Sequence, residues 1–324
     1  MLFLCYCFLM SVCLGGFYFY YYKFTLNDIP APNLSLSYSF NEKMQFLRNC
    51  PKDADIISIG SSMSLHNLHS KTITERLHSD KYLNVSSWGM SMEDNYFLLI
   101  TLCKIYSPNT LIIASDICDF GPSGNKGIKY SFLEKYLRSH YYVAILYQLL
   151  NFNLNYYISN LRSAKLVRNS PNDYIYLGFD KYGGVSLDTT NFNFDLTRWN
   201  GLALSPTNID TNQYSYLDKI STFCKSNKIK LLFFQSPIRT DVYSHLDNNS
   251  RNILKSHINT IENIMKRDNH IFINSNNAVW KDYLFVDRDH LSTYGAKLFT
   301  EYCFDKIKEG DKVSPSHLDY GDYK

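Results

Sequence analysis

The apolar positions of this chain follow two periods that alternate along its length. Short, mainly apolar runs indicate strands at residues 55–59, 82–85, 110–114, 230–234 and 271–273, and the run at 110–114 is typical of a strand covered on both faces. Between and after these runs, apolar residues recur at helical spacing, at 93–106, 217–224, 253–265 and 298–307. Ser292 or Thr293 can cap the last of these helices. The alternation predicts an α/β fold, in which a parallel sheet of about five strands has helices on both faces.

The N-terminal segment has a different pattern. Residues 2–22 contain no charged side chain and end in an aromatic cluster at 17–22, followed by Lys23. A helix rises about 1.5 Å per residue, so this stretch spans a hydrocarbon layer of about 30 Å. A cleaved signal peptide is the alternative, but no basic residue precedes the apolar stretch. We predict that residues 1–24 form a single-pass transmembrane helix, which anchors an extracytoplasmic (periplasmic or cell-surface) domain to the cell membrane.

The rest of the chain divides by composition. Residues 25–52, with Pro30 and Pro32, indicate a linker and an N-terminal extension. Residues 53–310 carry the alternating pattern and are expected to form the main domain, followed by a polar tail at 311–324. A segment at about 121–212, rich in Tyr and Asn, interrupts the alternation. We interpret it as an insertion, helical over 133–161 and looped afterwards, of the kind that often determines substrate specificity.

Overall composition excludes several classes of protein. The formal net charge of +3 gives no general attraction to nucleic acid. The 8 Cys have no spacing typical of metal ligands, and no glycine-rich phosphate-binding loop is present, so we expect no metal and no cofactor. The 27 Tyr are compatible with carbohydrate contacts, but a biased composition explains them equally well.

Two short motifs carry the candidate chemistry. Gly60-Ser61-Ser62 follows the first predicted strand, and Asp287-Arg288-Asp289-His290 precedes the last predicted helix. Ligands of parallel α/β sheets bind at the carboxyl ends of the strands, which is where Ser62 is expected. Each motif alone is weak evidence, because Gly-Ser-Ser triplets are usually turns. Together they supply a serine nucleophile (Ser62), a base (His290) and an acid that orients the base (Asp287, with Asp289 as the alternative).

These motifs, in this order, resemble the blocks of the SGNH (GDSL-like) hydrolase superfamily, with Ser61 in place of the Asp of the Gly-Asp-Ser block. The Gly-Ser-Ser variant resembles a membrane-anchored branch that modifies cell-surface polymers, as in teichoic acid D-alanylation and exopolysaccharide acetylation. The resemblance covers about residues 53–309 without the insertion. It implies a three-layer, flavodoxin-like fold in which Ser62, His290 and Asp287 are catalytic.

The resemblance also implies an oxyanion hole. Residues 84–91 match the second block, so the backbone N–H of Gly89 is expected to act beside that of Ser62. The third block normally supplies an Asn, but Asp116 stands there, and an ionised carboxylate cannot donate a hydrogen bond. Either Asp116 is protonated or Ser115 donates instead. Losing one donor lowers the rate by about 100- to 1,000-fold. Candidates for the substrate pocket are Ser61, His66, Trp88 and Ser115.

The sequence therefore predicts serine-dependent acyl transfer on a cell-surface polysaccharide, by an O-acetyl esterase or an O-acyltransferase. Expected partners are the glycan, the membrane and a membrane protein that supplies acyl groups, but no nucleic acid. Two alternatives remain open. The departure at Asp116 favours an inactive protein that binds polysaccharide or serves as an assembly scaffold, and the serine chemistry would also suit a lipid-directed esterase.

Overall fold

A computed structural model of the protein describes residues 1–25, 31–122, 126–140, 172–190 and 209–310, with individual positions between these ranges. The described strands form one parallel sheet in the order β2-β1-β3-β4-β5. This confirms the predicted α/β class, and the order is the flavodoxin-like one. The strands are β1 (Ile56–Ser58), β2 (Tyr82–Asn84), β3 (Thr110–Ser115), β4 (Lys230–Gln235) and β5 (Ile271–Asn274).

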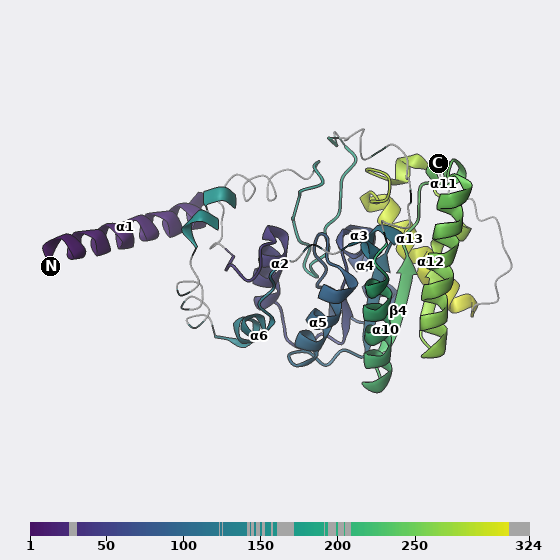
Figure 1. Ribbon diagram of the computed structural model, residues 1–324, viewed down its shortest axis with the longest axis horizontal. Helices are drawn as coiled ribbons and strands as arrows, with labels where there is room; N and C mark the ends of the chain where they lie inside the picture. The colour runs from purple at the N-terminus through teal and green to yellow at the C-terminus, as the bar shows by residue number, and fades with distance from the viewer. Residues whose placement is uncertain are drawn as a thin grey trace.

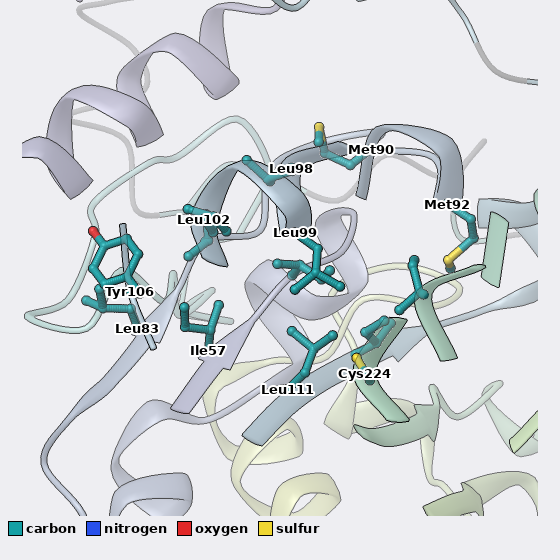
Figure 2. Packing of buried hydrophobic residues seen from close by; sticks show 14 of the residues in the cluster. Ile57, Leu83, Met90, Met92, Leu98, Leu99, Leu102, Tyr106, Leu111 and Cys224 are labelled. Atoms are coloured by element: carbon teal, nitrogen blue, oxygen red, sulfur yellow. The ribbon is translucent and has the colours of Figure 1, made fainter. Parts of the chain in front are cut away.

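Helices cover both faces of the sheet (Figure 1). Ile57 and Leu111 point to one face, where Leu99 and Leu102 pack against them (Figure 2). Each fully buried side chain of this kind contributes about 1.5–3 kcal/mol to folding. Helices on this face are α2 (Tyr38–Arg48), α5 (Met92–Cys103), α6 (Tyr130–Arg138), α10 (Thr211–Ser226) and α12 (Asn248–Arg267).

The opposite face of the sheet packs against the C-terminal helix. Ile112 and Phe234 alternate with the residues of the first face and contact Phe299 and its neighbours. The elements on this side are α3 (Ser62–Asn67), α4 (Ser70–Leu77) and α13 (Thr293–Glu309). Ser292 caps α13, where its side chain accepts a hydrogen bond from Gly295 N. The remaining short elements are η1 (Ile117–Phe120), α11 (Thr240–Ser244), η3 (Ser275–Asn277) and η4 (Asp282–Leu284).

The N-terminal segment contains two helices. α1 (Leu2–Thr25) coincides with the predicted anchor and lies at one end of the molecule, apart from the sheet (Figure 1). Within the described part of the chain, no helix combines the length and the apolar character needed to cross a membrane. The predicted span at 2–22 lies partly outside the described side chains, so the anchor stays a prediction.

α2 was missed by the sequence analysis, which placed residues 38–48 in an extension. Phe40, Met44 and Leu47 recur at helical spacing and are fully buried, while Ser37 caps the helix by accepting from Phe40 N. The pattern was therefore present, but four buried polar residues between these positions obscured it: Asn41, Glu42, Lys43 and Gln45.

The predicted insertion approaches the sheet through its second half. Its predicted helix at 133–161 begins in α6, and about half of its later positions lie outside the described residues. Residues 172–190 have no regular secondary structure and pack through Val185 and Leu187 against α3. The buried Lys43 ammonium donates to Asn84 O (3.2 Å) and to Gly183 O, and burial lowers the pKa of Lys43 to about 7. This contact ties the insertion to the carboxyl end of β2.

Candidate functional site

The position of Ser62 follows from the turn between β1 and α3. Gly60 has φ +146°, and a Cβ atom there would collide with the Ser64 side chain, so the turn requires glycine. Ser61 then caps α3, since its Oγ accepts from Met63 N at 3.1 Å. Ser64 Oγ accepts from Ala114 N at 2.7 Å, which fixes α3 to β3. Ser62 is therefore held in the first turn of a short helix at the carboxyl end of the sheet.

His290 lies in a tight loop that joins η4 to α13. Phe285 and Leu291 form an isolated antiparallel bridge, and Val286 N donates to His290 O at 2.9 Å. Inside the loop, Asp287 Oδ1 accepts from the backbone N–H of residues 289 and 290, at 3.1 and 2.8 Å. Asp287 thus folds the loop back on itself, which brings the His290 side chain toward α3.

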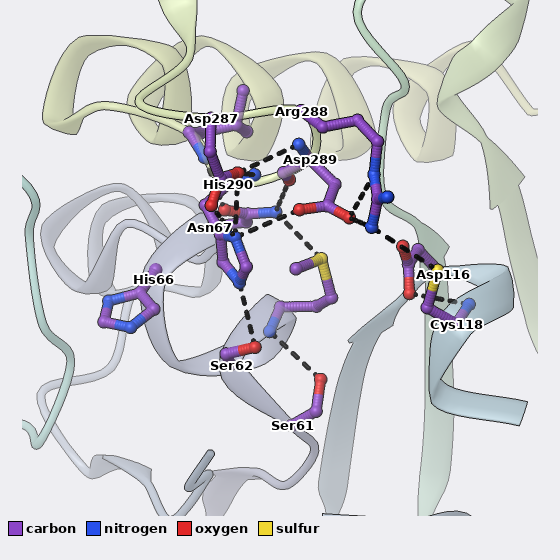
Figure 3. A network of polar contacts seen from close by, with 12 residues as sticks. Ser61, Ser62, His66, Asn67, Asp116, Cys118, Asp287, Arg288, Asp289 and His290 are labelled. Carbon is purple, nitrogen blue, oxygen red and sulfur yellow. Dashed lines mark hydrogen bonds and ion pairs between the residues drawn. The ribbon is translucent and has the colours of Figure 1, made fainter. Parts of the chain in front are cut away.

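The structure brings the three predicted catalytic side chains together (Figure 3). His290 Nε2 lies 2.9 Å from Ser62 Oγ, and His290 Nδ1 lies 2.8 Å from Asp287 Oδ2. Because Nδ1 faces a carboxylate, it carries a proton, which leaves Nε2 of the neutral ring to accept from the Ser62 hydroxyl. All three residues are buried, with Ser62 8% exposed. This connected chain can remove a proton from the serine.

Asn67, at the end of α3, fastens the histidine loop and was missed by the sequence analysis. Its amide donates to Asp289 O at 3.1 Å and accepts from Leu291 N at 2.9 Å. These contacts flank His290 on both sides, so α3 holds both Ser62 and the backbone that carries its base. No sequence signal marks Asn67, because its partners lie more than 220 positions away.

Tyr174 of the insertion was also missed, and it lies against the site. Its ring centroid is 4.7 Å from that of His290, and it stacks on Trp88 at 5.8 Å and 19°. Trp88 Nε1 donates to His66 Nε2 (3.2 Å), so His66 Nδ1 carries the proton that it donates to Val185 O (3.1 Å). His66 is therefore held in one neutral tautomer. Two of the predicted pocket residues, His66 and Trp88, form this aromatic wall.

The other two predicted pocket residues, Ser61 and Ser115, lie beside a half-buried carboxylate, that of Asp119. Ser115 Oγ donates to Asp119 Oδ2 at 2.8 Å, and the Ser61 hydroxyl also lowers the pKa of Asp119. Burial raises the pKa of Asp119 to about 6, against the effect of these two hydroxyls. Ser115 is thus occupied by Asp119, and Ser61 by the cap of α3.

The predicted oxyanion residues are placed at the same edge of the sheet, but no hydrogen bond joins either of them to Ser62 in the described structure. Asp116 caps η1 by accepting from Cys118 N (3.0 Å) and lies beyond Asp289, beside Arg288 (Figure 3). Burial and the neighbouring carboxylates raise the pKa of Asp116 well above its ordinary value, which favours the protonated form. Gly89 has φ +59° in a loop tied to Gly60 by a hydrogen bond from Ser87 N (3.1 Å). Both oxyanion roles stay predictions.

One further group of side chains has the composition of a metal site. Asp116, Cys118 and Asp289 bring one ligand atom each within 4.8 Å of one another. The Arg288 guanidinium lies 2.7 Å from Asp289 Oδ2 and 3.7 Å from Cys118 Sγ, so a cation already neutralises this group. We assign no metal here.

Comparisons with known proteins give structural similarity only. No family model and no curated protein matches the chain. The esterase EstA from Pseudoalteromonas sp. is 12% identical, with 79% of this chain and 97% of that chain covered at a TM-score of 0.40. TesA is 10% identical, with 78% and 98% covered at a TM-score of 0.40. A GDSL-like lipase from Bacteroides thetaiotaomicron is 9% identical, with 83% and 98% covered at a TM-score of 0.41.

Proposed function

We propose that this protein is an SGNH-like serine enzyme that transfers acyl groups. The observation that carries the proposal is the hydrogen-bonded chain from Ser62 through His290 to Asp287. Ser62 Oγ attacks an ester carbonyl while its proton passes to His290 Nε2, and Asp287 stabilises the imidazolium that forms. His290 then delivers the proton to the departing alkoxide oxygen, which leaves an acyl-serine.

The second half of the reaction decides between two activities. Water attacking the acyl-serine, with His290 as base, makes the protein an esterase. A sugar hydroxyl in the place of water makes it an O-acyltransferase. The same triad serves both reactions, so residues outside the triad must determine whether water or a sugar hydroxyl is the acceptor.

A cavity beside Gly89 supports a polysaccharide as substrate. It has a volume of about 410 Å³ and is lined in part by Glu93, Asp94, Phe97 and Lys126, with Lys126 Nζ 3.3 Å from where a Cβ on Gly89 would lie. Phe97 is 40% exposed, so its ring can stack on a sugar face, while the carboxylates can accept from sugar hydroxyls. We therefore propose an ester-linked acetyl group on a cell-surface glycan. The proposal keeps the membrane anchor, the extracytoplasmic location and a membrane protein that supplies acyl groups.

Fluorophosphonate labelling of the full chain tests the acyl-transfer proposal. Fluorophosphonates react with a serine whose hydroxyl is activated by a base. We expect the parent to be labelled, and the Ser62→Ala and His290→Ala variants to remain unlabelled. A folded parent that resists labelling would contradict the proposal and favour the inactive glycan-binding alternative. Labelling together with fatty acid release from micellar esters, and no action on acetylated glycans, would favour the lipid esterase.

Replacing Phe97 with Ala tests the glycan cavity. We expect kcat/KM on an acetylated polysaccharide to fall by about 5- to 100-fold, if a sugar ring gains from stacking on Phe97 the roughly 1–3 kcal/mol that a nucleic-acid base gains on an aromatic side chain. Hydrolysis of p-nitrophenyl acetate, which is too small to fill the cavity, should stay unchanged. Phe272 belongs to β5 and packs on the first face of the sheet, away from the cavity, so Phe272→Ala is the control for lost aromatic packing. An equal loss on both substrates would show that Phe97 acts through the fold.

A further inference from the structure

A second carboxylate lies against the catalytic histidine. Asp289 Oδ1 is 3.1 Å from His290 Nδ1, on the same nitrogen that faces Asp287. The other oxygen of Asp289 accepts from Arg288 Nε (3.1 Å) and Nη2 (2.7 Å). Both Asp289 and His290 are buried. One imidazole N–H thus faces two acids, and a guanidinium holds the second acid in place (Figure 3).

We propose that Asp289 is a positioning residue for His290 and that, with Arg288 as its counter-ion, it sets the pH above which the resting site contains a neutral base. This inference rests on the proposed acyl transfer, and assigns to that same site a residue that controls its pH dependence. Asp289 acts through His290, since its carboxylate contacts the imidazole and no hydrogen bond joins it to Ser62 among the described residues.

The charges around His290 favour its protonated form. From its own loop, Asp287 and Asp289 supply two carboxylates, against the single guanidinium of Arg288. His66, from α3, is neutral because Trp88 donates to it. The other groups that face this cluster are the Ser62 hydroxyl of α3, the Tyr174 phenol of the insertion, and Asp116, Cys118 and Asp119 at the end of β3.

Of the neighbouring carboxyl groups of Asp116 and Asp289, only one is ionised. Their carboxyl oxygens lie within 4.8 Å of each other in a buried setting, where two adjacent charges repel strongly. Burial raises the pKa of both, but His290 and Arg288 outweigh this at Asp289 and hold its pKa below the ordinary value. The pKa of Asp116 is raised, so the proton resides there. Asp289 is therefore the charged member, and the one in contact with the imidazole.

The consequence for pH dependence has a definite sign. Burial alone would lower the pKa of His290, but Tyr174, Asp287 and Asp289 together raise it well above the ordinary value. A general base must be neutral, so activity is lost as the pH falls through that raised pKa. The same charges stabilise the imidazolium during attack by Ser62. Asp289 thus strengthens proton transfer in the transition state while restricting the resting base to higher pH.

Nuclear magnetic resonance of the histidine rings measures this directly. The probe is the full chain labelled with ¹⁵N-histidine, and the His290→Gln spectrum identifies the His290 signals. In Asp289→Asn we expect the titration midpoint of His290 to fall by about one unit, since a neighbouring opposite charge shifts a pKa by roughly 1–3 units. In Asp289→Glu, which restores the charge, the midpoint should return toward that of the parent. In Arg288→Gln, which removes the counter-ion, it should rise.

The hydrogen bonds that hold residue 289 in the loop are made by its backbone N–H, to Asp287, and by its carbonyl oxygen, from Asn67. Asp289→Asn leaves both in place, so the loop should keep its fold. An unchanged or raised midpoint in Asp289→Asn overturns the proposal, and a lowered one in Arg288→Gln overturns the role of Arg288. The acid limb of kcat/KM on p-nitrophenyl acetate should move by the same amount as the midpoint. A shifted midpoint without any ester hydrolysis would reject the proposed acyl transfer, while leaving the effect of Asp289 on His290 established.

Discussion

Replacing Ser62 with Ala should lower kcat for p-nitrophenyl acetate by roughly 10⁶-fold, the size of loss typical when the nucleophile of a catalytic triad is removed. The reason is geometric. Ser62 Oγ lies 2.9 Å from His290 Nε2, and no other serine or threonine hydroxyl among the described residues is hydrogen-bonded to that nitrogen. The measurement is steady-state turnover at saturating substrate, at a pH where the parent is most active.

Ser61→Ala is the matched control, because Ser61 is the adjacent serine and is also buried. It should lose the cap of α3, which stabilises by about 1 kcal/mol, and keep turnover within about tenfold of the parent. The double variant Ser62→Ala with His290→Ala should be no slower than either single variant, since the two residues act as one unit. Additive losses in the double variant would mean that Ser62 and His290 do not cooperate in the reaction.

The sheet was predictable because its strands are covered on both faces. A run such as residues 111–114 is apolar throughout, and β3 occupies the buried centre of the sheet there. Local spacing likewise placed Ser62 after a strand and His290 before a helix. These positions depend on residues close in the sequence, which is the kind of information that periodicity contains.

Other parts of the site depend on contacts between distant segments. Tyr174 reaches His290 from residues 172–190, which have no regular secondary structure, so no periodicity marks it. Ser115 was expected to line a pocket, but Asp119 accepts the hydrogen bond of its hydroxyl at 2.8 Å. The orientation of a side chain at such an edge depends on its partners across the sheet, and a single sequence does not encode those partners locally.

Replacing Asn67 with Ala should disrupt the site without touching the triad. Asn67 is fully buried, and its loss leaves Asp289 O and Leu291 N without their side-chain partner. Each buried polar group left unpaired costs about 1–3 kcal/mol, so the free energy of unfolding should fall by about 2–5 kcal/mol. A displacement of the His290 loop by about 1 Å would lower kcat by about 100-fold. Urea denaturation measures the first effect and p-nitrophenyl acetate hydrolysis the second.

Asn95 supplies the control that separates the loss of a buried amide from the loss of its hydrogen bonds. It is also fully buried, but its amide oxygen and nitrogen have no hydrogen-bond partner among the described residues. Asn95→Ala therefore removes a buried amide without breaking a bond, and should change the free energy of unfolding by less than about 1 kcal/mol. If Asn67→Ala were as mild as Asn95→Ala in both measurements, α3 would not be holding the histidine loop. If Asn67→Ala lost stability but kept kcat, the loop would retain its catalytic geometry without Asn67. The contacts of Asn67 with the loop would then contribute to folding alone.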